Sequence, residues 1–146
     1  MIPSEPNNPP WLKLAAFALR SAIDEDFDAA GRAVTQIART YGNDEIPHLL
    51  CAFIDSFVTT TGAPVPDAFA FQAVETGFVT NADGVSPRVR WAGRLIMARA
   101  AMDHEQFFAL IDSVQSDEEW STNCSAVLEL CALNIRRHQE KEAARG

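Results

Sequence analysis

Residues 11–42 read WLKLAAFALRSAIDEDFDAAGRAVTQIARTYG, and they contain the pattern of two successive helices. Apolar residues recur in this stretch at the i, i+3, i+4, i+7 spacing that gathers side chains on one face of an α-helix. The spacing predicts one helix with an apolar face from Leu12 to Ile23 and a second from Phe27 to Ile37. Asp26 is the expected N-cap of the second helix, and Gly42 suits the position just beyond its end. The stretch therefore predicts a helical hairpin.

The helical spacing continues along the rest of the chain, and strand signals are nearly absent. Asn8 followed by Pro9 is the expected start of the first helix, and the last helix is expected to fray into a charged tail from residue 136 on. A shorter helix is expected over residues 67–78, followed by a loop over 81–86. Four other helices have start signals of their own, which are Asp44 with Pro47 in the first turn, Ser86-Pro87, Asp103, and the capping box from Ser116 to Glu119. The fold class is therefore all-α, with about seven helices in an antiparallel bundle or hairpin array.

The expected domain organisation is simple. Residues 1–10 form a proline-rich lead-in, residues 11–140 a single all-helical domain, and residues 141–146 a charged tail. A chain of 146 residues is long enough to bury a core without disulfides or metals.

An internal repeat is suggested by a shift of 80 residues, which places Trp11 on Trp91 and the run 50–53 on the run 130–133. A slip of one residue between these matches places Asp24 on Asp103. Duplication of a three-helix unit would produce these matches, with repeats over 11–62 and 87–140 joined by 63–86. Chance similarity between amphipathic helices rich in alanine is the alternative.

Within each unit the first two helices resemble a tetratricopeptide hairpin. Leu14, Phe17, Ala18 and Ser21 stand where that repeat has its large, large, small and aromatic positions, and residues 26–30 look like its turn. The sequence departs from the pattern at Val34, where an aromatic residue is usual, and no proline closes the unit. The resemblance implies a right-handed array of hairpins that binds a peptide or another protein.

The composition excludes some classes of binding partner. The net charge of −8 argues against a general nucleic-acid binder. No apolar run approaches the roughly 20 residues of a membrane span, and the N-terminus lacks the pattern of a secretory signal. Three widely spaced cysteines do not form a disulfide framework, and Cys51 and Cys131 are expected in the core. We therefore expect a cytoplasmic protein, and the ten arginines against two lysines hint at a bacterial or phage origin.

No catalytic or cofactor motif is present in the sequence. His48 has a cysteine three residues later, which is half a metal site at best, and we expect a histidine near the surface. The acidic residues of 24–28 either bind a divalent cation or, as we favour, complement the start of the second helix. We predict no catalytic residue, no metal and no cofactor.

Charge is unevenly distributed along the chain. Residues 40–87 contain six acidic residues and no Lys or Arg, whereas residues 88–99 are basic and contain no acid. The residues predicted to form a partner-facing basic patch are Arg88, Arg90, Arg94 and Arg99. A solvated surface with no partner is the alternative.

The leading prediction of function is a non-enzymatic protein–protein interaction module, a small helical adaptor or regulator that binds another protein, a peptide or a second copy of itself. The first alternative is a small-molecule binder or enzyme with an apolar pocket, lined by the aromatic residues Phe53, Phe57, Phe69, Phe71 and Phe78. The second is DNA-related regulation through the helix that carries Arg88 to Arg99, which the net charge opposes.

Overall fold

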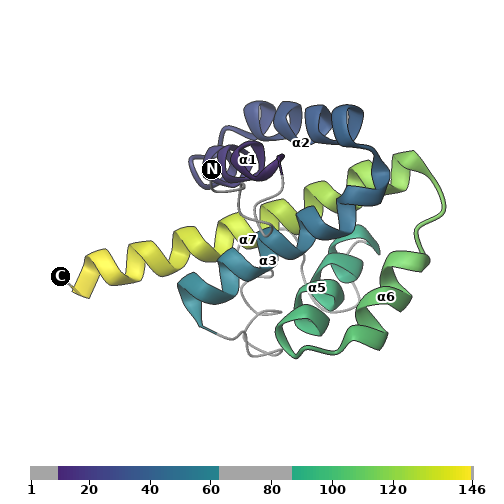
Figure 1. Cartoon of the computed structure of the whole chain (residues 1–146). Coiled ribbons are helices and arrows are strands. Elements are labelled where there is room, and N and C mark those ends of the chain that lie inside the picture. The colour runs from purple at the N-terminus through teal and green to yellow at the C-terminus, as the bar shows by residue number, and fades with distance from the viewer. Residues whose placement is uncertain (1–9, 63–86, 146) are drawn as a thin grey trace, which may run out of the picture.

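The computed structural model describes residues 10–62 and 87–145 of the chain. Within these residues it contains six α-helices, one 3-10 helix and no strand, so the predicted all-α class is confirmed. The elements are α1 (Leu12–Ile23), α2 (Phe27–Tyr41), η1 (Asn43–Glu45), α3 (Ile46–Thr61), α5 (Pro87–Ala100), α6 (His104–Asp112) and α7 (Asp117–Arg145) (Figure 1). The predicted helix over 67–78, the loop over 81–86 and the Asn8-Pro9 start lie outside the described residues. The expected count of seven helices is therefore not confirmed.

Side-chain caps begin α2 and α6, as predicted. The backbone N–H of Ala29 donates to Asp26 Oδ1 at 3.2 Å, and that of Gln106 donates to Asp103 Oδ1 at 3.1 Å. Each bond satisfies an N–H group that the first turn of a helix leaves without an intrahelical partner. The two aspartates therefore fix where α2 and α6 start.

The prediction that Asp44 caps the third helix is wrong. The chain turns at Gly42, whose φ is +89°, and enters η1 directly, so Asp44 lies inside this 3-10 helix. Because η1 runs into α3 without a break, α3 begins at Ile46 with no side-chain cap. Pro47 lies in the first turn as predicted, where its missing N–H has no helical partner to lose. At the other end α3 stops at Gly62, whose φ is +87°.

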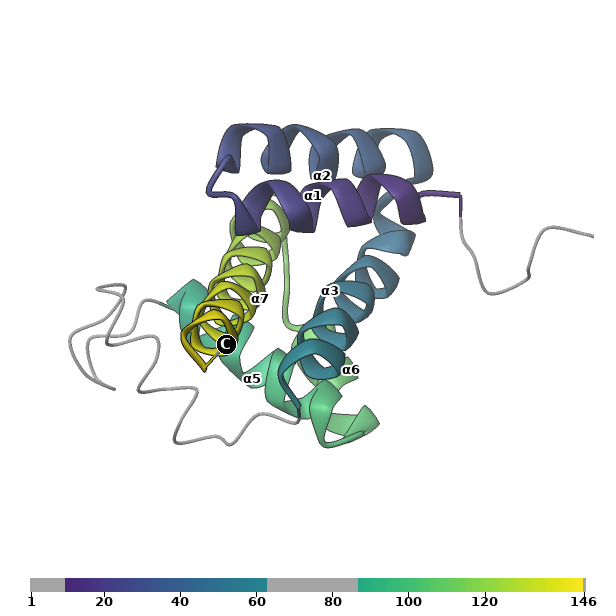
Figure 2. The ribbon, with the colours of Figure 1, turned by 90° about the vertical axis from the view of Figure 1, so that its left-hand side faces the viewer.

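Two parallel helices, α3 and α7, form the centre of the molecule (Figures 1 and 2). Their starts are joined by a hydrogen bond in which Asn43 Nδ2 donates to Asp117 Oδ1 at 3.0 Å. The α1–α2 hairpin lies across one side of this pair, where α1 packs on both helices, and the α5–α6 hairpin lies on the other side. The central pair therefore separates the two hairpins.

The core follows from these contacts. All six described α-helices contribute buried apolar side chains to one hydrophobic core. The largest fully buried side chains are Phe53, Ile37, Leu49, Leu50, Ile54, Leu95, Ile96, Leu130, Val127 and Cys131. Truncating one of the larger of these to alanine typically costs about 2–5 kcal/mol, so the central pair supplies much of the stability.

Two buried tryptophans attach the hairpins to their neighbours. Trp11 precedes α1 and donates from Nε1 to Glu45 Oε1 at 2.9 Å. Trp91 lies in α5, donates from Nε1 to the backbone oxygen of Leu110 at 2.9 Å, and packs edge-on against Trp120 with ring centroids 6.4 Å apart. Both indole N–H groups thus find an acceptor inside the protein, as burial demands.

The turns of the two hairpins share one geometry. Glu25 and Met102 have positive φ values of 66° and 58°. The N–H of the next residue, Asp26 or Asp103, bonds back to Ser21 O or Ala98 O at 2.8 and 2.9 Å. This bond closes a Schellman motif, and the same aspartate caps the following helix. The equivalent residues are 77 apart, so the turns do not follow the shifts of 79 and 80 on which the sequence matches rest.

A tetratricopeptide-like arrangement is not confirmed. A repeat array stacks each hairpin on the next. Here α1 and α5 both pack on α7, with the two hairpins on opposite sides of the central pair. The duplication of a three-helix unit stays a prediction.

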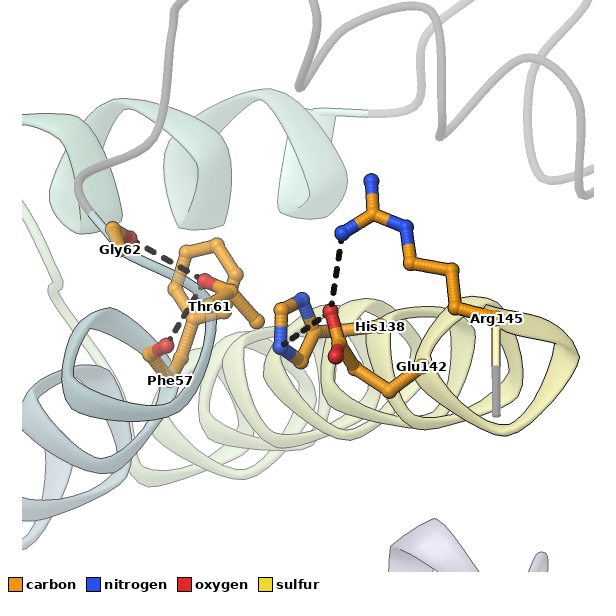
Figure 3. A network of polar contacts seen from close by, with 6 residues as sticks. All are labelled: Phe57, Thr61, Gly62, His138, Glu142 and Arg145. Atoms are coloured by element: carbon orange, nitrogen blue, oxygen red, sulfur yellow. Dashed lines mark hydrogen bonds and ion pairs between the residues drawn. The ribbon is translucent and has the colours of Figure 1, made fainter.

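Helix α7 is longer than the sequence predicts, because the residues expected to fray continue the helix to Arg145. Ion pairs one turn apart stabilise this end: Arg136 pairs with Glu140 at 3.7 Å, and Arg145 with Glu142 at 3.5 Å. Figure 3 shows His138 and Arg145 directed at Glu142, beside the last turn of α3. Despite its length α7 carries too many charges to cross a membrane, and no other described helix is suited to do so.

Candidate partner-binding groove

The four arginines of the predicted basic patch do not lie on one face of α5. Arg88 and Arg99 are eleven residues apart, about three turns, and therefore point to the same side of the helix. Arg88 Nη1 lies 3.1 Å from Glu129 Oε2 of α7. Arg99 binds Asp55 of α3 through two hydrogen bonds of 2.9 Å. These two arginines thus join α5 to the central pair.

Arg90 and Arg94 are both exposed, and their positions lie roughly on the opposite side of the helix from Arg88. Arg90 has an interaction within the chain. Arg94 forms no ion pair with any part of the chain that the structure describes. Partner binding by the patch stays a prediction, and these two arginines are the members whose side chains face solvent.

The cysteines have no disulfide partner, and two of them are buried. Burial raises the pKa of the Cys124 thiol to about 12, and it also raises the pKa of Cys131. Cys51, expected in the core, is only partly buried. Its pKa is raised by desolvation, with Arg99 opposing and Asp55 adding to the shift. All three thiols are therefore held in the protonated, less nucleophilic form at neutral pH.

The acidic turn before α2 has structural partners. Asp26 caps α2, and Glu25 Oε1 lies 3.0 Å from Arg136 Nη1, which also donates to the Ile23 carbonyl at 2.8 Å. No group of three His, Cys, Asp or Glu side chains within residues 10–62 and 87–145 could hold a metal ion. His48 is exposed at the start of α3, as expected of a surface histidine.

The apolar pocket expected from the central phenylalanines is not seen for the two members that the structure describes. Phe53 and Phe57 are buried in the core at 1% and 3% exposure, where they pack between helices. Phe69, Phe71 and Phe78 lie outside the described residues.

An open groove of about 660 Å³ runs along α2 and the first turns of α7. It exists because α2 packs on α1 and η1 and stands away from α7. From one end of α2 to the other the lining residues are Phe27, Asp28, Gly31, Arg32, Val34, Thr35, Gln36, Arg39 and Thr40, with Ser121 and Ser125 contributed by α7. This groove was not predicted from the sequence.

The groove is locally basic on an acidic protein. Arg32 and Arg39 are exposed and, among the described residues, neither forms an ion pair. They are seven residues apart, so they lie about 10 Å from each other along the same face of α2. Asp28 supplies the one acidic group of the lining, near the N-terminal end of α2. Half-exposed Phe27 lies beside it.

Gly31 is the fifth of the 15 residues of α2 and lies inside the helix, where a glycine is destabilising by about 1 kcal/mol relative to alanine. A Cβ atom added at this position would meet no atom within 4 Å, and its φ is not positive. Neither internal packing nor backbone geometry within the described residues therefore requires a glycine here. Its missing side chain leaves the helix backbone open to whatever enters the groove.

The comparisons with known proteins give no further guide to the groove. No protein-family model, no curated protein and no solved structure matches this chain.

Proposed function

We propose that the chain is a non-enzymatic protein–protein interaction module, a small helical adaptor or regulator, and that its partner docks in the groove between α2 and α7. The observation that carries the proposal is Gly31, a helix-destabilising residue that no packing within the described residues requires, in the lining of an open groove. A partner that packs closely against the backbone of α2 at this point would require a residue without a side chain, which explains the glycine.

The lining supports a macromolecular partner over a small substrate. The groove is open and extends over four turns of α2, from Phe27 to Thr40. Small-molecule sites, in contrast, are concave and enclose most of their ligand. The exposed Phe27 ring at one end offers the aromatic anchor that protein interfaces favour. Free thiols support a reducing compartment, such as the cytoplasm, as the place of action.

Substitution of Gly31 tests the proposal because stability and binding should move in opposite directions. In Gly31→Gln, a better helix former replaces glycine and its side chain fills open space, so the protein should be no less stable than the wild type. The same side chain should block the groove. Affinity capture from extracts of the source cells, followed by mass spectrometry, should recover a partner with the wild type and lose it with Gly31→Gln.

Thr59→Gln is the matched control, because Thr59 is exposed on α3 and outside the groove lining. It should retain the partner. Capture of the same proteins by the wild type and by Gly31→Gln would overturn docking at this groove. Arg90→Glu combined with Arg94→Glu, assayed in the same way, tests the predicted basic patch of α5 as a second docking surface.

A further inference from the structure

Resting on the proposed function, we infer the chemistry of the partner: the groove takes an acidic helical segment whose carboxylates meet Arg32 and Arg39. The first observation is the pairing state of the arginines. Other arginines of the chain, such as Arg88, Arg99 and Arg136, are satisfied by carboxylates of neighbouring elements. Arg32 and Arg39 lie in a groove and form no ion pair with the described residues.

The spacing of the two arginines selects a helix as the occupant. They are two turns apart on one face of α2, about 10 Å along its axis. A second helix lying alongside α2 offers carboxylates at matching height when they too are seven residues apart. In an extended strand, residues on one face are about 6.6 Å apart, or 13 Å for the next pair, and neither interval matches.

Small residues in the lining of the groove leave room for a helix that packs at close range. Gly31 on α2 and Ser121 and Ser125 on α7 are small, and small residues let helix backbones approach. Moreover, within the described residues α2 packs mainly on one helix, α1, whereas α3 packs on α1, α5 and α7. An incoming helix would therefore occupy a packing position that α2 leaves open.

The net charge of −8 does not exclude an acidic partner. At physiological ionic strength the Debye length is about 8 Å, so charges beyond the groove are largely screened and the arginines of the lining dominate. Asp28 places a negative charge at the N-terminal end of the groove, whereas Arg32 and Arg39 place positive charges farther along α2. The partner should place its carboxylates toward Arg39 and an apolar or basic residue at the end formed by Phe27 and Asp28.

Peptide selection tests this inference separately from the proposed function. A random peptide library displayed on phage is selected on the wild-type protein and counter-selected on Gly31→Gln, so that survivors need the groove. The expected survivors are amphipathic helical peptides enriched in Asp and Glu seven residues apart. Survivors with no acidic enrichment would overturn the acidic partner and leave the groove as a docking site. If no peptide distinguishes the wild type from Gly31→Gln, both proposals fail.

Charge reversal provides the second measurement, on the selected peptides labelled with fluorescein. Arg32→Glu combined with Arg39→Glu should weaken binding at least about tenfold in fluorescence anisotropy, because two attractive contacts become repulsive. Lys13→Glu combined with Lys141→Glu makes the same change in net charge at exposed positions outside the lining, and should change binding less than about twofold. Equal losses in the two variants would overturn direct contact by the arginines.

Discussion

The hairpins α1–α2 and α5–α6 turn in the same way but pack differently. In both, a residue of positive φ precedes an aspartate that caps the second helix. Yet α5 buries Leu95 and Ile96 completely against the central pair, whereas α2 buries mostly alanines and packs on α1. Turn chemistry therefore sets the shape of a hairpin, while the size of the apolar side chains decides how much of each helix is buried in the core.

The difference in packing also determines where the arginines of α5 and α2 lie. Because α5 is held by α3, α6 and α7, its arginines at 88 and 99 are drawn into ion pairs within the chain. Because α2 stands away from α7, its arginines at 32 and 39 face a groove. The groove beside α2 is therefore the surface that we propose for a partner.

The largest effect should come from removing the tryptophans that attach the hairpins. Trp91→Ala and Trp11→Ala should each lower the free energy of unfolding by about 3–5 kcal/mol, since both rings are buried. Trp91→Ala should cost about 1 kcal/mol more, because Trp91 also loses its edge contact with Trp120. Urea unfolding followed by circular dichroism at 222 nm measures both. A costlier Trp11→Ala would show that the first hairpin is the more firmly attached.

The next effect concerns Arg136, a side chain of α7 that binds the end of α1. Arg136→Gln removes the hydrogen bond to the Ile23 carbonyl and the ion pair with Glu25. We expect a loss of about 1 kcal/mol, which is modest because these side chains are partly exposed to solvent. Thermal unfolding in low salt checks the loss. Arg145→Gln, at the exposed end of α7, is the control and should change stability by no more than about 0.5 kcal/mol.

If the two turns are equivalent, removing either N-cap side chain should lower the free energy of unfolding by the same amount. Asp26→Ala and Asp103→Ala each remove one cap hydrogen bond and a negative charge from the start of a helix. Each should cost about 1 kcal/mol. Chemical denaturation of the two variants, with Asp26→Asn and Asp103→Asn as conservative partners, tests the equivalence. Costs that differ by more than about twofold would break it.

The smallest effect comes from the residues of positive φ. Met102 is 61% exposed with a φ of 58°, and a glycine there would relieve strain. Since glycine also gains entropy in the unfolded chain, Met102→Gly should stabilise by only about 0.5 kcal/mol. Glu25→Gly should gain less, because it loses the ion pair with Arg136. Calorimetric midpoints of the two variants rank them, and a destabilised Met102→Gly would contradict strain at this turn.

Local patterns predicted the helices that the structure describes, with an error where two local signals competed. The caps at Asp26 and Asp103 and the stop at Gly62 depend on residues within one turn of each other, so the sequence shows them. Asp44 also looks like a cap, but the turn at Gly42 begins a 3-10 helix earlier. The charges of α7 from residue 136 on looked like a frayed end, although their spacing allows ion pairs within the helix.

The groove could not be predicted in the same way. Its signals are present in the sequence as a glycine inside a helix and two arginines seven residues apart. Neither is informative until it is known that no atom of the described residues comes near a side chain added at Gly31, and that Arg32 and Arg39 form no ion pair within residues 10–62 and 87–145. Conversely, the basic run of α5 was conspicuous in the sequence, yet half of it joins helices within the chain.

By itself the sequence determined the all-α class and most helix boundaries, because hydrophobic spacing and caps act over a few residues. Only the tertiary structure decided that α3 and α7 form a parallel central pair, that the hairpins lie on opposite sides of it, and that Arg88 and Arg99 pair with carboxylates of these two helices. Those outcomes depend on which apolar faces fit together and on carboxylates more than 40 residues away, as in the pair of Arg99 with Asp55. The spacing of residues along one helix does not predict such contacts between distant elements.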